Sequence, residues 1–248
     1  MESLDGHGYM ILGGSGAIGS ALGHRLAERG AHVVVVGRTE ASVQETAEEL
    51  GGTAVVADAT DFDAVSEAVA QAGEAAGELR GGANCVGSIL LRPARMTSRE
   101  DFDATVGQNL ASAFALVRSL APILARGEGG GLGFVSSSAA RVGLPNHEAV
   151  AAAKAGVEGL VRAAAASYAG RGVRFNAVAP GLVDTPMASR ITSNEKSLET
   201  SRAMHPVGRI GEPDEIARVL EWLITPDGGW VTGEVVGVDG GMARVRTG

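Results

Sequence analysis

The segment that most constrains the fold is residues 9–19, in which a short apolar run is followed by four closely spaced glycines and a helix-like repeat. The apolar run at 9–12 is long enough for a buried strand. Ile18, Leu22 and Leu26 recur at four-residue spacing, which is typical of one face of a helix. A helix that begins directly after a glycine turn presents unpaired N–H groups and the positive end of its dipole. This order of strand, turn and helix start predicts a site that holds a phosphate.

The glycines of this turn fit the pattern G-x-G-x-x-G at Gly14, Gly16 and Gly19. Taken alone, the pattern could also mark an ordinary turn. Its context favours a dinucleotide site, because a helix is expected over 17–29 and a second apolar strand follows at 32–36. Glycine is needed at such a turn because a side chain would keep the backbone away from a pyrophosphate.

Strands and helices alternate along the whole chain, which predicts an α/β fold with a Rossmann-like doubly wound parallel sheet of about seven strands and helices on both faces. Further strands are expected at 53–57, 83–86, 132–136, 173–179 and 235–238. Helices are expected up to 50, over 62–76, 99–126 and 150–170, and from Pro213, while 184–209 is a polar segment. No linker is long enough for a second domain, so residues 1–248 are expected to form a single domain whose strand-end loops meet at one cleft.

Charge and cysteine content restrict the partners. The chain has 21 basic and 29 acidic residues and a formal net charge of −8, which disfavours nucleic acid and anionic membranes as partners. One cysteine, Cys85, excludes an internal disulfide and fits a reducing compartment, so a cytoplasmic location is expected. The N-terminal residues do not resemble a signal peptide, no apolar run reaches the length of a membrane span, and no metal site is predicted.

Short motifs at the strand ends carry a family resemblance. Residues 12–19 are similar to T-G-x-x-x-G-x-G with Leu and Ala at two positions, and 84–87 are similar to N-N-A-G with two departures. Residues 176–181 read N-x-x-x-P-G, and 231–234 and 238–241 match a C-terminal signature. In this order and spacing, the chain resembles the classical short-chain dehydrogenase/reductase family over nearly its whole length, and within it the 3-oxoacyl carrier-protein reductase-like members.

The resemblance implies an oxidoreductase that acts on a small-molecule carbonyl or alcohol substrate, with Asp58 contacting the adenine of a nicotinamide cofactor. Related proteins also imply a homotetramer or homodimer, joined through the long helices after strands four and five. The residues expected to bind the cofactor are Gly13, Ser15, Gly16, Ala17, Ile18, Gly19, Arg38, Asp58, Ala59, Asn84, Val86, Gly87, Lys154, Pro180, Gly181, Val183 and Thr185.

Cofactor choice depends on the end of the second strand. NAD-binding members place an acidic residue there to hold the ribose 2′-hydroxyl. This chain has Gly37 and Arg38 instead, and an arginine can bind a 2′-phosphate through two parallel hydrogen bonds. Arg38 could also be a solvated loop residue, but its position favours NADP(H).

The catalytic set that the resemblance implies is incomplete. The family uses Ser, Tyr and Lys with a helix Asn, and its Tyr lies four residues before its Lys, on the same helix face. Lys154 and Asn109 match, and Ser137 stands thirteen residues before Val150, with serines on either side that allow a shift of register. The position four before Lys154 is Val150, and a valine cannot exchange a proton.

His147 is the candidate replacement, so the predicted catalytic residues are Ser137, Lys154, Asn109 and His147. It lies seven residues before Lys154, a spacing at which related enoyl reductases place their tyrosine, and it can exchange a proton near neutral pH. It could equally be a loop residue without a chemical role. Three interpretations therefore stay open: an NADP(H)-dependent oxidoreductase with a modified catalytic set, a cofactor-binding protein without hydride transfer, and an enzyme of non-redox, elimination-type chemistry.

Two further groups of residues are interpreted more simply. Arg92 and Arg95 follow strand four near the mouth of the cleft, where they could meet an anionic substrate or remain solvated. Met187, Met204 and Met242 are interpreted as packing residues.

Overall fold

A computed structural model describes residues 2–246 of the chain. Seven parallel strands form a sheet in the order β3-β2-β1-β4-β5-β6-β7. Their bounds are β1 Gly8–Leu12, β2 His32–Gly37, β3 Thr53–Val56, β4 Leu79–Asn84, β5 Gly130–Val135, β6 Val173–Pro180 and β7 Val235–Val238. The order reverses between β1 and β4, so the sheet has the switch point at which doubly wound folds bind ligands. The predicted fold class is confirmed.

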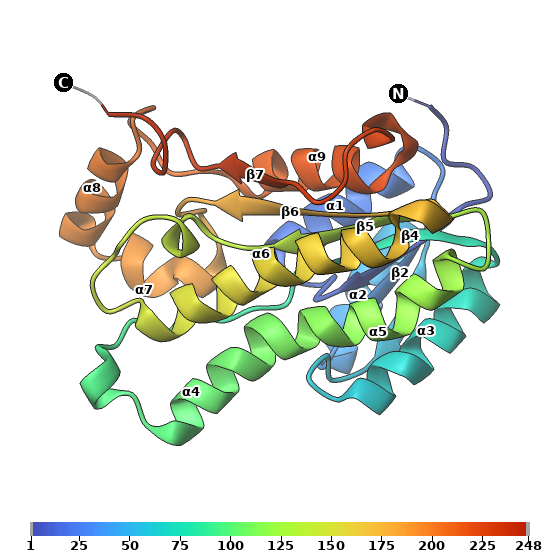
Figure 1. The fold of residues 1–248 in the computed structure, drawn as a ribbon, viewed down its shortest axis with the longest axis horizontal. Coiled ribbons are helices and arrows are strands. Elements are labelled where there is room, and N and C mark those ends of the chain that lie inside the picture. Colours follow the sequence, from blue (N-terminus) through green and yellow to red (C-terminus); the bar gives the residue numbers. More distant parts are fainter. Residues whose placement is uncertain (1, 247–248) are drawn as a thin grey trace.

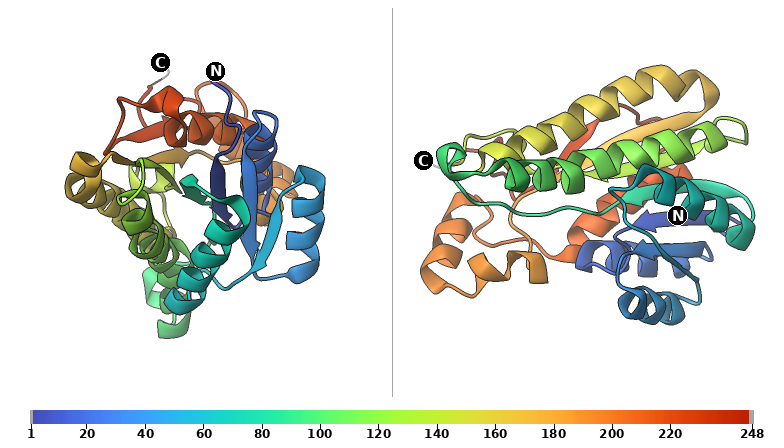
Figure 2. Two further views of the ribbon diagram at one scale, coloured as in Figure 1. Left: turned by 90° about the vertical axis from the view of Figure 1, so that its right-hand side faces the viewer. Right: turned by 90° about the horizontal axis from the view of Figure 1, so that it is seen from below.

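Helices cover both faces of this sheet (Figures 1 and 2). One face carries α1 Ala17–Ala27, α2 Glu40–Leu50 and α9 Pro213–Ile224. The other face carries α3 Phe62–Ala76, α4 Arg99–Val106, α5 Ser112–Leu124 and α6 Glu148–Tyr168. Two shorter helices, α7 Ser189–Thr192 and α8 Glu195–Met204, lie beyond the carboxyl ends of β6 and β7, at the left of Figure 1.

The apolar core is split by the sheet into two layers. Successive residues of a strand point to opposite faces, and β1 shows this directly. Met10 and Leu12 pack with the α3, α5 and α6 layer, whereas Tyr9 and Ile11 pack with the α1, α2 and α9 layer. Because β1 is apolar on both faces, it is buried at the centre of the sheet, as expected of a parallel strand.

Strand β4 begins at Leu79, earlier than the predicted start at residue 83. Glycines at 81 and 82 are typical of a loop, but here they make room for packing. A Cβ at Gly81 would lie 2.9 Å from the Tyr9 ring, and one at Gly82 would lie 2.9 Å from the Leu120 side chain. The missing side chains therefore let β4 pair with its neighbours beneath two large buried residues.

Two other predicted segments are subdivided. The helix expected over 99–126 is α4, a π-helical turn at Gly107–Ala111, and then α5. The segment at 184–209, expected to be polar without an assigned element, contains α7 and α8. Helix α8 begins where the Asn194 side chain accepts a hydrogen bond from the Ser197 N–H at 2.9 Å, an N-cap that the sequence analysis overlooked.

Candidate active site

The glycine turn after β1 shapes one edge of a cleft at the carboxyl ends of β1 to β4. Gly13 has a φ of +72°, in the left-handed region that side chains rarely adopt. A Cβ at Gly19 would lie 2.3 Å from the Gly13 carbonyl oxygen. Helix α1 can therefore approach the turn closely only because both positions are glycine. This brings the N-terminus of α1 to the cleft, with Gly13, Ser15 and Gly16 in its wall.

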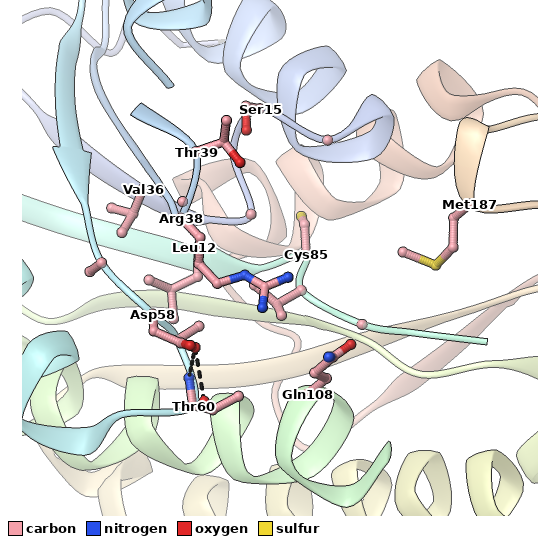
Figure 3. Close-up of a pocket in the computed structure, with 17 residues that line it drawn as sticks. Leu12, Ser15, Val36, Arg38, Thr39, Asp58, Thr60, Cys85, Gln108 and Met187 are labelled. Atoms are coloured by element: carbon pink, nitrogen blue, oxygen red, sulfur yellow. Dashed lines mark hydrogen bonds between the residues drawn. The ribbon is translucent and has the colours of Figure 1, made fainter. Parts of the chain in front are cut away.

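The cleft contains many of the residues expected to bind the cofactor (Figure 3). Those in its wall are Gly13, Ser15, Gly16, Arg38, Asp58, Ala59, Val86 and Gly87. The wall also includes residues that the sequence analysis did not assign to the site: Leu12, Val36, Gly37, Thr39, Ala57, Thr60, Cys85, Gln108 and Met187. Most of the added residues adjoin an expected one at a strand end, so the same loops line the cleft over a longer stretch than expected. The residues present fit a dinucleotide, because the glycine turn leaves open the space that side chains would fill.

Arg38 and Asp58 give the cleft its charge. The Asp58 Oδ1 atom accepts hydrogen bonds from the Thr60 N–H at 2.9 Å and the Thr60 hydroxyl at 2.8 Å. These bonds, with the charge of Arg38, hold the pKa of the Asp58 carboxyl below its ordinary value. Arg38 is exposed, and its guanidinium extends into the cleft. One cation therefore stands at the end of β2, and the carboxylate at the end of β3 remains ionised.

Several expected cofactor residues lie behind this wall. Ala17, Ile18 and Gly19 form the first turn of α1. Asn84 is buried at the end of β4, where its Nδ2 donates to the Ser112 hydroxyl and its Oδ1 accepts from the Val86 N–H, both at 2.9 Å. Asn84 therefore fixes the course of the loop at 84–87.

The connection after β6 is also braced. Val183 is buried and forms a bridge to Gly211, and the Thr185 hydroxyl accepts a hydrogen bond from the Ala188 N–H. These contacts fix the chain between Gly181 and α7 without placing either side chain in the cleft wall.

Lys154 and Asn109 converge on Gly87. A Cβ at Gly87 would lie 2.9 Å from the Asn109 Oδ1 and 3.3 Å from the Lys154 Nζ. The buried Lys154 ammonium donates to the Val135 carbonyl at 2.6 Å, and burial lowers the pKa of this amine to about 8. The Asn109 amide, in the π-helical turn, donates to the Thr105 carbonyl at 3.0 Å. Gly87 thus lets a cation and an amide lie together at the cleft edge.

The three consecutive serines have different partners. Ser136 donates to the Glu158 carboxylate at 3.0 Å, and Ser138 donates to the Asp239 carboxylate at 2.8 Å. Ser137 accepts a hydrogen bond from the Ala139 N–H at 3.1 Å, and within residues 2–246 its own proton has no acceptor. The structure therefore distinguishes the register: Ser137 carries the hydroxyl that is free to donate to a ligand.

Ser137 lies in the wall of a second cavity, of about 810 Å³, which shares Met187 with the cofactor cleft. Its wall also includes Val150, His147, Pro180 and Gly181, together with parts of α7 and α8. Val150 is buried one helical turn before Lys154. The apolar side chain of Val150 therefore faces the space beside Ser137.

His147 is the residue that precedes α6. Its Nδ1 lies 2.8 Å from the Pro145 carbonyl oxygen. Because a carbonyl can only accept, the Nδ1 carries a proton, and the Nε2 of the neutral ring is then an acceptor. A charged His147 ring would have a second proton, on Nε2, to give.

Residues beyond the predicted site complete this cavity. Met187 and Met204 are 51% and 39% exposed, so their interpretation as packing residues was wrong. His205 is buried, donates from Nδ1 to the Ser201 carbonyl at 2.6 Å and accepts from the Leu182 N–H at 3.1 Å. It thereby links the end of α8 to the turn that follows β6.

Within residues 2–246, no cluster of His, Cys, Asp or Glu side chains has the arrangement of a metal site. Within the same residues, every helix is too short or too polar to cross a membrane.

Comparison with known proteins agrees with the fold. The family model described as enoyl-(acyl carrier protein) reductase matches residues 14–243. The chain is 32% identical to the 3-oxoacyl-(acyl-carrier-protein) reductase of Thermotoga maritima, over 96% of this chain and 98% of that protein. It is 36% identical to the inactive 2-(S)-hydroxypropyl-CoM dehydrogenase 2 of Xanthobacter autotrophicus, over 87% of this chain and 96% of that protein.

Among solved structures, a short-chain type dehydrogenase/reductase from Mycobacterium ulcerans superposes with a TM-score of 0.92 at 28% identity. The match covers 97% of this chain and 91% of the other. The family model, the sequence relatives and the structural match each cover most of this chain. The chain therefore belongs to the classical short-chain dehydrogenase/reductase family, an oxidoreductase family whose members use nicotinamide cofactors.

Proposed function

We propose that this protein is an NADP(H)-dependent oxidoreductase of a small-molecule carbonyl or alcohol substrate, with Val150 where related enzymes have a catalytic tyrosine. One observation carries the proposal. The free hydroxyl of Ser137 lies in the wall of a cavity that adjoins the cofactor cleft. Lys154 and Asn109 lie at the edge of that cleft, next to Gly87. A carbonyl oxygen in this cavity would meet a hydrogen-bond donor beside the cofactor.

The choice of NADP(H) is supported by the charge at the end of β2. A 2′-phosphate placed there would meet the exposed guanidinium of Arg38. NAD-binding proteins have an acidic residue at this position to bind the 2′-hydroxyl, and the described residues of this part of the cleft wall include no such acid. Among residues 2–246, Asp58 is the only carboxylate in this wall, and it already accepts hydrogen bonds from Thr60. An NADP phosphate would therefore gain an ion pair at Arg38.

In the proposed reaction, the cofactor and three side chains, Ser137, Lys154 and His147, each have a separate role. A bound nicotinamide supplies or accepts the hydride. Ser137 donates a hydrogen bond to the carbonyl oxygen, and this bond strengthens as negative charge develops there. Lys154 holds positive charge at the cleft edge below its pKa of about 8 and would bind the ribose of the cofactor there. We propose that His147 donates the proton that the substrate oxygen takes up during reduction, because Val150 has no proton to exchange. The charged form of His147 would donate this proton from Nε2.

A second candidate function is cofactor binding without hydride transfer. The observation in its favour is the isopropyl group of Val150, which presents only carbon atoms to the cavity beside Ser137. One relative, the Xanthobacter autotrophicus protein, carries the word inactive in its name. This function predicts cofactor affinity without turnover.

We also propose that the chain is a single domain that assembles as a homotetramer or homodimer in the cytoplasm, with neither nucleic acid nor membrane as a partner. Exposed aromatic residues on the predicted contact helices support the assembly: Phe102 on α4 is 43% exposed and Phe114 on α5 is 47% exposed. Burial of such side chains between copies would be favourable. The single Cys85 and the net charge of −8 fit the other two proposals.

The test is NADPH oxidation, followed at 340 nm, with a panel of aldehydes, ketones and oxo acids. The proposal predicts slow turnover by at least one member of the panel and more turnover with NADPH than with NADH. NADPH binding without oxidation by any compound would favour the second candidate. Failure to bind either nucleotide would contradict both.

A further inference from the structure

The large cavity beside Ser137 has a charge opposite to that of the protein. The chain has a net charge of −8, yet among the described residues the cavity wall contains three cations, Arg92, Arg190 and Lys196, and no carboxylate. In so acidic a protein, a wall with cations alone concentrates positive potential where a ligand enters. The wall is therefore suited to an anion.

Two of the three cations have no ionic partner among residues 2–246. Arg92 forms an ion pair with Asp101. None of the ion pairs within residues 2–246 includes Arg190 or Lys196. Both are exposed, Arg190 on α7 and Lys196 in the first turn of α8. Because a cation at a helix N-terminus opposes the helix dipole, Lys196 does not serve the stability of α8.

The remaining wall is mostly apolar and open. Four large side chains that line it keep much of their surface exposed: Ile89 at 42%, Leu91 at 44%, Met187 at 51% and Met204 at 39%. A gathering of exposed apolar side chains inside one concave site is typical of a ligand-binding surface. An apolar ligand body of several carbons would cover them.

Resting on the proposed function, we propose that the substrate is amphipathic: a carbonyl or hydroxyl compound whose apolar chain carries an anionic end group. The reacting oxygen lies at Ser137, the chain lies along Ile89, Leu91 and the methionines, and the end group binds Arg190 and Lys196. Carboxylate, sulfonate and phosphate share the oxyanion chemistry that these cations recognise.

The test measures binding and does not depend on turnover. Isothermal titration of the protein, saturated with NADPH to fill the cofactor cleft, compares octanoate with octanamide, which has the same chain without the charge. Octanoate should bind about tenfold more tightly, since bonds to charged groups are the stronger ones. Octanesulfonate and octyl phosphate then distinguish among the three oxyanions.

Variants assign the effect to the two cations. The double variant Arg190→Gln/Lys196→Gln should lose the preference for octanoate and keep its octanamide affinity. The control Arg126→Gln/Arg171→Gln removes the same charge from exposed positions next to the starts of β5 and β6, at the opposite edge of the sheet, and should keep the preference. Circular dichroism verifies that both variants fold.

The outcomes separate this inference from the proposed function. Equal affinities for octanoate and octanamide, or a preference that survives in the double variant, would overturn the anion-binding role. A preference that depends on both cations, with no oxidation of NADPH by any oxo acid, would support the ligand class while the proposed oxidoreductase activity fails.

Discussion

Replacing Lys154 with methionine should stabilise the cofactor-free protein while weakening its cofactor binding. Burial lowers the pKa of Lys154 from 10.5 to about 8. At 1.36 kcal/mol per pKa unit, this shift corresponds to roughly 3 kcal/mol by which the charged amine destabilises the folded state below pH 8. Loss of the bond to the Val135 carbonyl would cost about 1 kcal/mol. Lys154→Met should therefore raise the free energy of unfolding at pH 7 by about 2 kcal/mol.

The sign of the pH dependence follows from proton counts. Between pH 8 and 10.5, the unfolded chain keeps the Lys154 proton that the folded protein has released. The contribution of Lys154 therefore makes the free energy of unfolding of the unmodified protein rise with pH over this range. Below pH 8 both states hold the proton, and the destabilisation is constant. Lys154→Met should abolish this part of the rise.

Urea unfolding at pH 7, 8, 9 and 10 measures the effect. One protein concentration must be used throughout, because an oligomer has a concentration-dependent stability. The methionine variant should be the more stable protein at pH 7, and the two should converge as the pH rises towards 10. A variant that is less stable at pH 7, or that keeps the full pH dependence, would refute the view that Lys154 is retained for function at the expense of stability.

The other predictions concern the proton donor. Val150→Tyr should raise ketone reduction by about 10²-fold, since general acid catalysis contributes about 10²–10⁴-fold and the phenol would lie one turn before Lys154. An unchanged rate in a variant that still binds NADPH would show that the rest of the site is not arranged for this reaction. His147→Ala should reduce native turnover at least about tenfold without changing NADPH affinity. His147→Gln, which keeps a polar side chain but cannot donate a proton as an acid, is the matched variant. If either variant turns over substrate as fast as the unmodified protein, His147 is a loop residue without a catalytic role.

The strands show why much of the fold follows from local sequence. β2 is buried on both faces and reads as a nearly continuous apolar run, and β6 is largely apolar although it includes Arg174 and Asn176. Both positions were predicted to within one residue. β4 has two glycines near its start, where a Cβ would clash with atoms of other elements, among them the Tyr9 ring and the Leu120 side chain. Its boundary could not be found locally because packing across the sheet determines it.

The site divides in the same way. The glycine turn depends on local backbone geometry, and Arg38 depends only on its place at the end of one strand. Their positions in the sequence were therefore enough to predict that they line the cleft. The choice among three serines depends on Glu158 and Asp239, which lie 22 and 101 residues away from Ser136 and Ser138. The cations of α7 and α8 reach the large cavity only through the folding of a segment whose sequence is largely polar. Contacts between distant segments are what the sequence alone did not provide.

Fluorescence titration of the protein and its Arg38→Asp variant with NADPH and NADH measures whether Arg38 selects NADP(H). The unmodified protein should bind NADPH at least about tenfold more tightly than NADH, because Arg38 pairs with the 2′-phosphate. In the variant, a carboxylate would repel the phosphate and favour a ribose hydroxyl, so the preference should shrink or reverse. Equal affinities of the unmodified protein for the two nucleotides, or an unchanged preference in Arg38→Asp, would show that Arg38 does not select the 2′-phosphate.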